Sequence, residues 1–301
     1  MKSIALVCVA AGSASLSNYF IRKNSVANYS TNAYLLCYYV ISFVVACLIF
    51  PEVFTMAVNP LMLAIGGIVG VLNILLMYLT TRALERGPAG LTFAFQNGGA
   101  IFPVLILFLV FGEAFGFTIV PIQIIGMGLV IAGLWLGSKN QTPASSSFTK
   151  GWFKYALGCF FLQMFTLTLF HWRCLLFSCN LQEHILIPTT ISESADAWFM
   201  PGFFGVATIL QALIFLKEKR WIKSKEILYG SIGGASNGVS TFLIITATKI
   251  ALPIEKSILF PCFAVAVIIF CSAWGYKVYG ERINLAASAT CALGIIVAAL
   301  A

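Results

Sequence analysis

Long apolar runs alternate with short polar breaks along the whole chain. Charged residues, prolines and glycines divide it into ten apolar runs, near residues 3–21, 32–51, 61–81, 88–111, 117–137, 152–172, 196–216, 227–248, 254–276 and 283–300. An α-helix needs about 20 predominantly apolar residues to cross the hydrocarbon core of a bilayer. The pattern therefore predicts an all-α integral membrane protein with ten transmembrane helices.

The composition agrees with this pattern. Hydrophobic residues make up 60% of the 301 positions and charged residues only 9%, whereas a soluble domain usually carries about 25% charged residues. Ten spans use roughly 200 residues and leave about 100 for loops and ends, which is too few for a separate soluble domain. We expect a multi-pass protein of the plasma (inner) membrane.

The polar residues exclude several enzyme classes. Asp196 is the only aspartate, so a membrane aspartyl protease, which needs two, is excluded. His171 and His184 are the only histidines, and neither begins an H-E-x-x-H metalloprotease motif. The nine cysteines contain no C-x-x-C pair, so we expect them to be core residues. The sequence favours a protein with no catalytic site, metal or cofactor.

Two sets of residues recur in the second half of the chain. Gly66, Gly70 and Asn73 recur 164 positions later, and Gly112, Glu113 and Gly126 recur 168 positions later, as Gly230, Gly234 and Asn237 and as Gly280, Glu281 and Gly294. The chain thus divides into a first five-helix repeat (1–137), a linker (138–151) and a second five-helix repeat (152–301). Because five is odd, the second repeat has the opposite orientation in the membrane, and such inverted repeats hold their substrate near the bilayer midplane.

The segment 78–113, YLTTRALERGPAGLTFAFQNGGAIFPVLILFLVFGE, resembles the third and fourth helices of EamA-type transporters of the drug/metabolite transporter (DMT) superfamily. The shared pattern is a helix that ends in A-L, a short turn before P-A, a mid-span proline and a terminal G-E. Segment 246–281 is a weaker second copy. The resemblance implies a carrier that works by alternating access and catalyses no reaction. Members of that superfamily carry amino acids, nucleotide sugars, purines or cationic drugs.

Asn73 and Asn237 are the central polar residues of their predicted helices. An unpaired carboxamide in hydrocarbon costs several kcal/mol, so both side chains should face the helix bundle. Each lies on one helical stripe with two glycines. The stripe could pack helices closely with the amide as an interhelical hydrogen-bonding group, or it could leave a cavity beside a substrate-binding amide. The sequence leaves both interpretations open.

Gln96 and Asn97 precede two glycines and lie shortly before Pro103. Adjacent helical positions point about 100° apart, so we expect only Asn97 to face a cavity while Gln96 bonds a neighbouring helix. Pro103 and Pro261 should kink their helices. The resembled fold builds its cavity from the first four helices of each half, which adds further candidates for the lining: Gln163, Thr166, Thr168 and Asn18.

The positive charges are distributed unequally between the two sides. Odd-numbered loops carry 14 of the 18 lysines and arginines, and the other side carries four. The positive-inside rule then places the odd-numbered loops in the cytoplasm and both termini outside. Members of the resembled family have both termini inside, and we follow the charge count. The net charge of +8 has the same origin, so we expect no nucleic-acid partner.

Small-residue pairs occur in the fifth and tenth predicted helices, as Gly133-x-x-x-Gly137 and Gly294-x-x-x-Ala298. They could pair two subunits in a homodimer or pack helices within one chain.

The expected partners are otherwise a small-molecule substrate and the lipid bilayer. The leading interpretation is a secondary transporter of a small polar or amphipathic metabolite, such as an amino acid, a nucleotide or a related solute. The alternatives are a polytopic enzyme acting on a lipid or prenyl substrate and a non-transporting membrane subunit. His171, close to Arg173, is expected at the membrane interface.

Overall fold

The computed structural model describes residues 2–112, 120–139, 151–176, 191–251, 253–280 and 285–299. Its regular structure is entirely helical, with no strand in these segments. Seven helices are long and apolar enough to cross a membrane: Lys2–Val26, Thr31–Ile49, Pro60–Leu84, Ala89–Phe111, Trp152–Leu175, Ser194–Leu216 and Leu259–Tyr279. The prediction of an all-α, multi-pass membrane protein is confirmed at this level.

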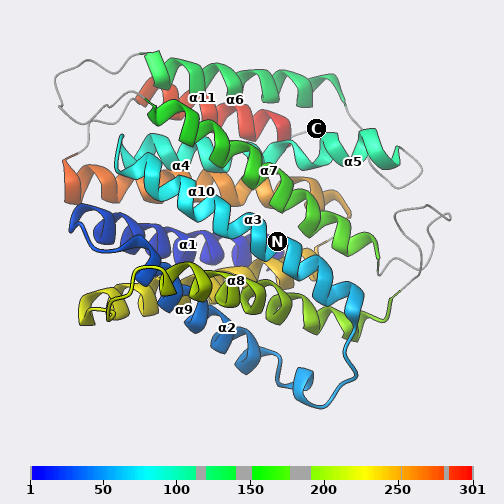
Figure 1. Ribbon diagram of the computed structural model, residues 1–301. Helices are drawn as coiled ribbons and strands as arrows, with labels where there is room; N and C mark the ends of the chain where they lie inside the picture. The colour runs from blue at the N-terminus through cyan, green and yellow to red at the C-terminus, as the bar shows by residue number, and fades with distance from the viewer. Residues whose placement is uncertain are drawn as a thin grey trace.

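The helices lie side by side, and most of them run roughly along one common direction (Figure 1). In chain order they are α1 (Lys2–Val26), α2 (Thr31–Ile49), η1 (Pro51–Phe54), α3 (Pro60–Leu84), α4 (Ala89–Gly98), η2 (Gly99–Ile101), α5 (Pro103–Phe111), α6 (Pro121–Lys139), α7 (Trp152–Leu175), η4 (Glu193–Trp198), α8 (Phe199–Leu216), α9 (Ser224–Ile250), α10 (Pro253–Tyr279) and α11 (Leu285–Ala299).

Local sequence explains where several of these helices begin. The side chain of Ser30 accepts a hydrogen bond from the Ala33 backbone N–H at 3.2 Å and caps α2. The side chain of Asn59 does the same for the Met62 N–H at 3.0 Å, with Pro60 as the first residue of α3. Such caps satisfy backbone donors that have no partner within the helix.

Pro103 interrupts the helix expected over residues 88–111. Proline has no N–H, so the Gly99 carbonyl loses its usual donor four residues later. It accepts instead from the Phe102 N–H at 3.3 Å, which tightens the chain into the 3₁₀ turn η2 between α4 and α5. Pro261, by contrast, lies inside α10, which continues on both sides of it.

The most extensive helix contacts join the two halves of the chain. α3 packs against α7 and α8, while α9 packs against α1 and α2; α10 contacts α1 and α4, and α4 also contacts α7. Glycines allow the close approaches. A Cβ atom on Gly70 would collide with the Phe203 carbonyl of α8, and one on Gly234 would collide with the Tyr38 carbonyl of α2. The repeated glycines therefore pack helices.

α6 and α11 form a further pair at one edge of the bundle (Figure 1). A Cβ atom on Gly133 would lie 2.7 Å from the Cys291 backbone nitrogen, and one on Gly294 would lie 2.7 Å from the Gly126 carbonyl oxygen. The small residues Gly133 and Gly294 thus hold α6 and α11 together within one chain.

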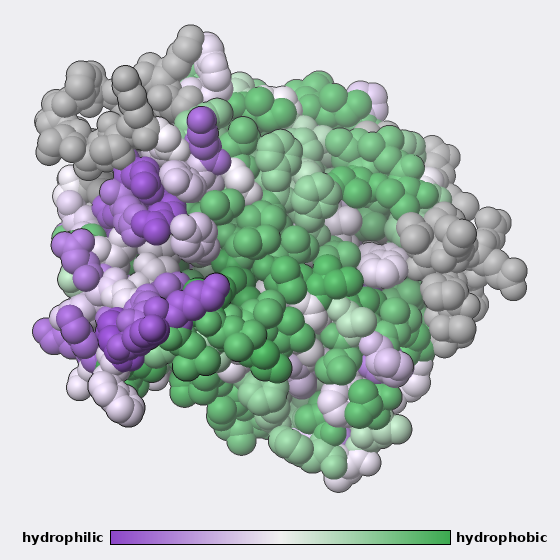
Figure 2. All heavy atoms as spheres, viewed as in Figure 1, coloured by the Kyte–Doolittle hydropathy of each residue, from purple (hydrophilic) through white to green (hydrophobic). Residues whose placement is uncertain are grey.

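Figure 2 shows hydrophilic surface gathered at one end of the helices and hydrophobic surface over their middle. At the hydrophilic end, Lys23 lies 5.1 Å above the ring of Tyr229, and Arg86 lies 4.8 Å above the ring of Tyr155. Tyrosines beside basic residues are typical of the level at which a membrane meets water.

The same end is closed by hydrogen bonds to Glu218, which follows α8. Its carboxylate accepts from the side chains of Ser30 at 2.8 Å, Asn32 at 2.7 Å and Arg220 at 2.8 Å. Burial raises the pKa of Glu218, but these donors and the Arg220 charge outweigh it and hold the pKa below its ordinary value. The ionised carboxylate therefore ties the start of α2 to the loop before α9.

Substituting Gly234 with alanine should destabilise the fold, because the new methyl group has no room beside Tyr38. Overpacking of this kind costs about 1–3 kcal/mol. Gly128 is the matched control, since nothing lies within 4 Å of a Cβ there and alanine is the better helix former. We expect G234A to lower the melting temperature of the purified protein and G128A to leave it unchanged or raise it. Equal effects would show that the α2–α9 contact is not tight.

Candidate functional site

A cavity of about 100 Å³ lies between helices of both halves. It is lined by all five amides predicted from the sequence to bind substrate: Asn73, Gln96, Asn97, Gln163 and Asn237. Asn18 and Thr166 also line it. Thr168 is not among the described lining residues, and its hydroxyl donates to the Met164 carbonyl of its own helix at 2.8 Å. Residues that lie up to 253 positions apart in the sequence, from 14 to 267, thus meet in one place.

Asn73 and Asn237 lie one turn beyond the glycines that pack α3 and α9. The Asn73 side-chain oxygen accepts a hydrogen bond from the hydroxyl of Tyr39, a buried residue of α2, at 2.9 Å. The Asn237 side-chain nitrogen is buried and has no hydrogen-bond partner among the described residues. The two interpretations of the stripe are therefore compatible: its glycines pack helices, and its amides border the cavity.

Gln96 and Asn97 both line the cavity, so the expectation that only Asn97 would reach it is wrong. The Gln96 side-chain oxygen does accept from Thr80 of α3 at 3.2 Å, as expected for a bond to a neighbouring helix. The Asn97 amide donates to the Phe93 carbonyl one turn back at 2.8 Å. The expectation considered only the 100° angle between adjacent helical positions. A glutamine side chain is long enough to bond one neighbour and still border the cavity.

Hydroxyl groups complete the polar part of the lining, and sequence reasoning missed most of them. They belong to Ser17, Tyr38, Ser240 and Thr241, besides Thr166. Ser240 and Thr241 follow Asn237 by three and four positions, which places them on the same helical face, so helical spacing could have found them. Tyr38 gave no such signal. The Thr166 hydroxyl has no hydrogen-bond partner among the described residues.

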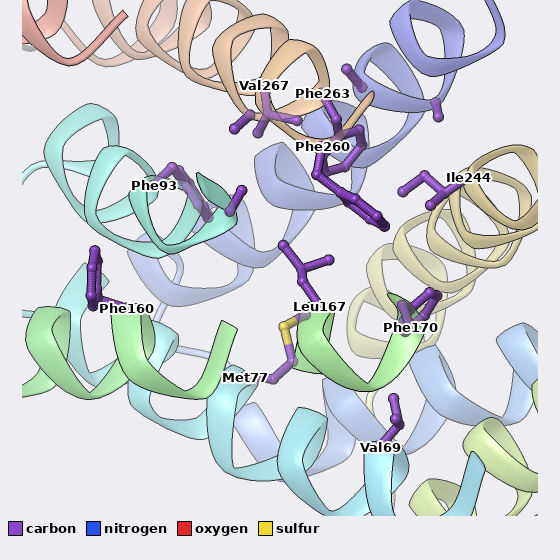
Figure 3. Packing of buried hydrophobic residues seen from close by; sticks show 14 of the residues in the cluster. Val69, Met77, Phe93, Phe160, Leu167, Phe170, Ile244, Phe260, Phe263 and Val267 are labelled. Carbon is purple, nitrogen blue, oxygen red and sulfur yellow. The ribbon is translucent and has the colours of Figure 1, made fainter. Parts of the chain in front are cut away.

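Apolar side chains form the rest of the wall. Figure 3 shows Leu167 of α7 and Met77 of α3 close together, with Phe263 and Val267 reaching in from α10. The remaining apolar lining residues are Ala14, Leu76, Phe170, Phe203 and Ile244. The cavity therefore offers hydrogen bonds and apolar contact together.

A buried ion cluster lies outside the described cavity lining, and sequence reasoning missed it. Asp196 of η4 lies 3.3 Å from the Arg173 Nε of α7 and 2.8 Å from the Lys249 Nζ of α9. The Asp196 and Arg173 side chains are almost fully buried, and the guanidinium also lies 4.6 Å above the ring of Phe199. The cluster joins three helical segments near the end of the bundle opposite the hydrophilic one.

His171 contacts the bundle interior. Its ring lies 4.5 Å from the ring of Phe260, and it borders a second, smaller cavity of about 20 Å³ together with Gln123 and Pro261. His171 thus contacts the interior from near the end of α7, and its expected position at the membrane interface stays a prediction. Within the described segments, no three His, Cys, Asp or Glu side chains are grouped as a metal site would require.

Some residues named from the sequence lie outside the described segments. They are Glu113, Glu281, His184 and residues 140–150 of the linker.

No model of a known protein family matches this chain, and no curated protein matches it in sequence. Its fold is similar to that of a solved chain described only as the crystal structure of a protein. The two share 14% sequence identity with a TM-score of 0.62, and the match covers 98% of this chain and 97% of that chain. At this level of identity the similarity establishes a shared fold and nothing about activity.

Replacing Asp196 with asparagine should strongly destabilise the protein, because it leaves the buried Arg173 charge without its carboxylate. Breaking one side of a buried ion pair costs about 3–5 kcal/mol. The matched control is E85Q, since Glu85 pairs with Arg82 at 3.1 Å on the exposed surface, where such pairs contribute about 0–1 kcal/mol. Thermal unfolding of the two purified variants measures the difference. Equal losses of stability would contradict a structural role for the cluster.

Proposed function

We propose that this chain is a secondary transporter that carries a small polar or amphipathic metabolite across a membrane by alternating access. The observation that carries this proposal is the polar cavity inside an otherwise apolar helix bundle. Polar residues within membrane spans are costly and are retained mainly where they bind or conduct a solute. Here six side-chain amides, including that of Asn18, border one space.

The proposal includes ten membrane-spanning helices arranged as two inverted repeats. The contact pattern supports it. In such an arrangement α1, α2 and α3 correspond to α7, α8 and α9, and α4 corresponds to α10. The contacts of α3 with α7 and α8 then have a counterpart in the observed contacts of α9 with α1 and α2. The contact of α1 with α10 likewise has a counterpart in that of α7 with α4. A two-fold relation between the halves would produce this pattern.

Individual residues support the same relation. Gly70 packs on Phe203 of α8, and Gly234 packs on Tyr38 of α2. One turn further, Asn73 and Asn237 both line the cavity, as do Tyr38 and Phe203. The cavity thus lies where the two halves meet, which is the expected substrate position in inverted-repeat carriers.

Alternating access in this architecture is a rocking of the halves around the cavity. The break between α4 and α5 gives the first half a place where the helix axis can change direction, because η2 lacks the regular α-helical hydrogen bonds. Membership of the EamA-type family is part of the proposal and rests on the resemblance of segment 78–113. No catalytic step or cofactor is required.

The orientation follows from the charges at the hydrophilic end. Lys23, Arg86 and Arg220 all lie in or near odd-numbered loops, and positive loops favour the cytoplasmic side. We therefore propose that this end faces the cytoplasm of a plasma (inner) membrane. A homodimer through α6 or α11 stays a prediction, and it would have to use faces other than the stripes that hold those two helices together.

Transport should depend on cavity groups and not on similar groups nearby. Proteoliposomes containing the purified chain should take up at least one solute from a labelled panel of amino acids, nucleobases, nucleosides and polyols, with saturation and with acceleration by the same solute inside. T166V should raise the KM about 2- to 12-fold, because it removes one hydrogen bond to the solute and such a bond contributes about 0.5–1.5 kcal/mol. T168V is the matched control on the same helix and should leave the KM unchanged.

T166V should fold as well as the original chain, because the Thr166 hydroxyl has no partner to lose among the described residues. T168V loses only the bond to the Met164 carbonyl of its own helix. Asn237→Leu should weaken transport more than it lowers the melting temperature. The proposal fails if no panel solute shows saturable uptake, or if T166V and T168V change the KM equally.

The orientation is testable at Ser224, an exposed residue at the start of α9. A variant without native cysteines that carries Ser224→Cys should resist a membrane-impermeant maleimide in intact cells and react after lysis. Equally efficient labelling before and after lysis would reverse the proposed orientation. A cysteine at Thr55, in the loop on the opposite side between η1 and α3, is the control and should react in intact cells.

A further inference from the structure

The described lining of the cavity carries no formal charge. Its twenty described lining residues comprise amides, hydroxyls and apolar side chains, and they include no Asp, Glu, Lys, Arg or His. From this lining we propose that the solute bound there is uncharged at neutral pH and carries hydrogen-bond donors, hydrogen-bond acceptors and an apolar face. This inference rests on the proposed transport function and narrows its substrate class, because it excludes amino-acid zwitterions and nucleotides.

An ionised solute would find no compensating charge among the described lining residues. Moving an ion out of water into a protein interior carries an effective penalty of several kcal/mol unless an opposite charge or a full set of hydrogen bonds replaces the water. A neutral solute that keeps its hydrogen bonds avoids that penalty. The lining therefore selects against charge.

Two charged residues that follow lining residues on the same helices have partners away from the cavity. Arg173 lies one turn beyond the lining residue Phe170, but its guanidinium pairs with Asp196 and lies over the ring of Phe199. Lys23 follows the lining residue Asn18 on α1 and lies over aromatic rings at the hydrophilic end. Neither belongs to the lining.

The polar groups of the lining are mixed in kind. An anion is best held by donors alone and a cation by acceptors alone, whereas a primary amide offers two donors and a carbonyl acceptor. Asn237 keeps a buried side-chain N–H₂ without a partner, and Thr166 keeps a buried hydroxyl without one. Both are groups that a bound solute would satisfy, and leaving them unsatisfied carries a cost.

The volume of the cavity and its apolar surface restrict the class of solute further. An apolar cavity of about 150 Å³ can hold benzene, so about 100 Å³ admits a group somewhat smaller than that ring in this conformation. Phe170, Phe203 and Phe263 offer flat apolar contact. Small neutral acyclic amides fit this description.

Three matched pairs of probes separate charge from shape. Acetamide and acetate differ by a carboxamide against a carboxylate, propionamide and propionate differ in the same way with one more methylene group, and urea and guanidinium differ by a positive charge at nearly constant shape. Equilibrium binding of each compound to the purified full-length chain in lipid nanodiscs, at neutral pH, is measured by calorimetry. At least one neutral member should bind at least 100-fold more tightly than its ionised partner.

The site of that binding is tested with the same pair of valine variants. T166V should weaken binding of the neutral probe 2- to 12-fold, and T168V should leave it unchanged. The proposal is overturned if the ionised members bind as tightly as the neutral ones, if no neutral member binds, or if T168V has the same effect as T166V.

Uptake of the same compounds into proteoliposomes distinguishes this inference from the proposed function. Binding of a neutral probe without saturable uptake would refute transport and leave the binding preference standing. Saturable uptake of an ionised probe that T166V impairs would refute the neutral-solute inference and leave transport standing.

Discussion

The structure depends on the cost of a polar group in hydrocarbon. An amide, hydroxyl or charge within these helices is costly unless it finds a partner inside the bundle, because lipid supplies none. The partners come from other helices. Tyr39 donates a hydrogen bond to Asn73, Thr80 donates one to Gln96, and Asp196 forms ion pairs with Arg173 and Lys249. The polar residues therefore define which helices must lie together.

Glycines make those contacts between the halves possible. Close approach at Gly70 and Gly234 brings α3 against α8 and α9 against α2, and the amides of Asn73 and Asn237 one turn away border the cavity. The glycines that pack the helices and the amides that line the cavity thus follow one another on one helical face. Groups such as the Glu218 hydrogen bonds and the Asp196 cluster then close the two ends of the bundle.

The two halves supply different chemistry from corresponding elements. On α3, Asn73 is followed by the apolar Leu76 and Met77, whereas on α9 Asn237 is followed by Ser240 and Thr241. These different side chains give one cavity both hydrogen-bonding and apolar walls. Such a cavity suits a solute that is itself amphipathic, and the absence of charge among its described lining residues suits a neutral one.

The sequence by itself determined that the helices lie in a bilayer, roughly where they run, and which amides are the strongest candidates for a cavity lining. Hydropathy predicted helical segments because a bilayer dictates their length, and mid-span Asn73, Gln96, Asn97, Gln163 and Asn237 were recognisable because amides are costly there. Only the tertiary structure decided that these amides border one cavity, that Tyr38 joins them, and that Arg173 and Asp196 pair. Helix periodicity specifies the face of one helix, but contacts between residues far apart in the chain depend on how the helices pack. The break before Pro103 lies between these cases: proline predicted a disturbed helix, and the Phe102 hydrogen bond to Gly99 decided that it is a 3₁₀ turn.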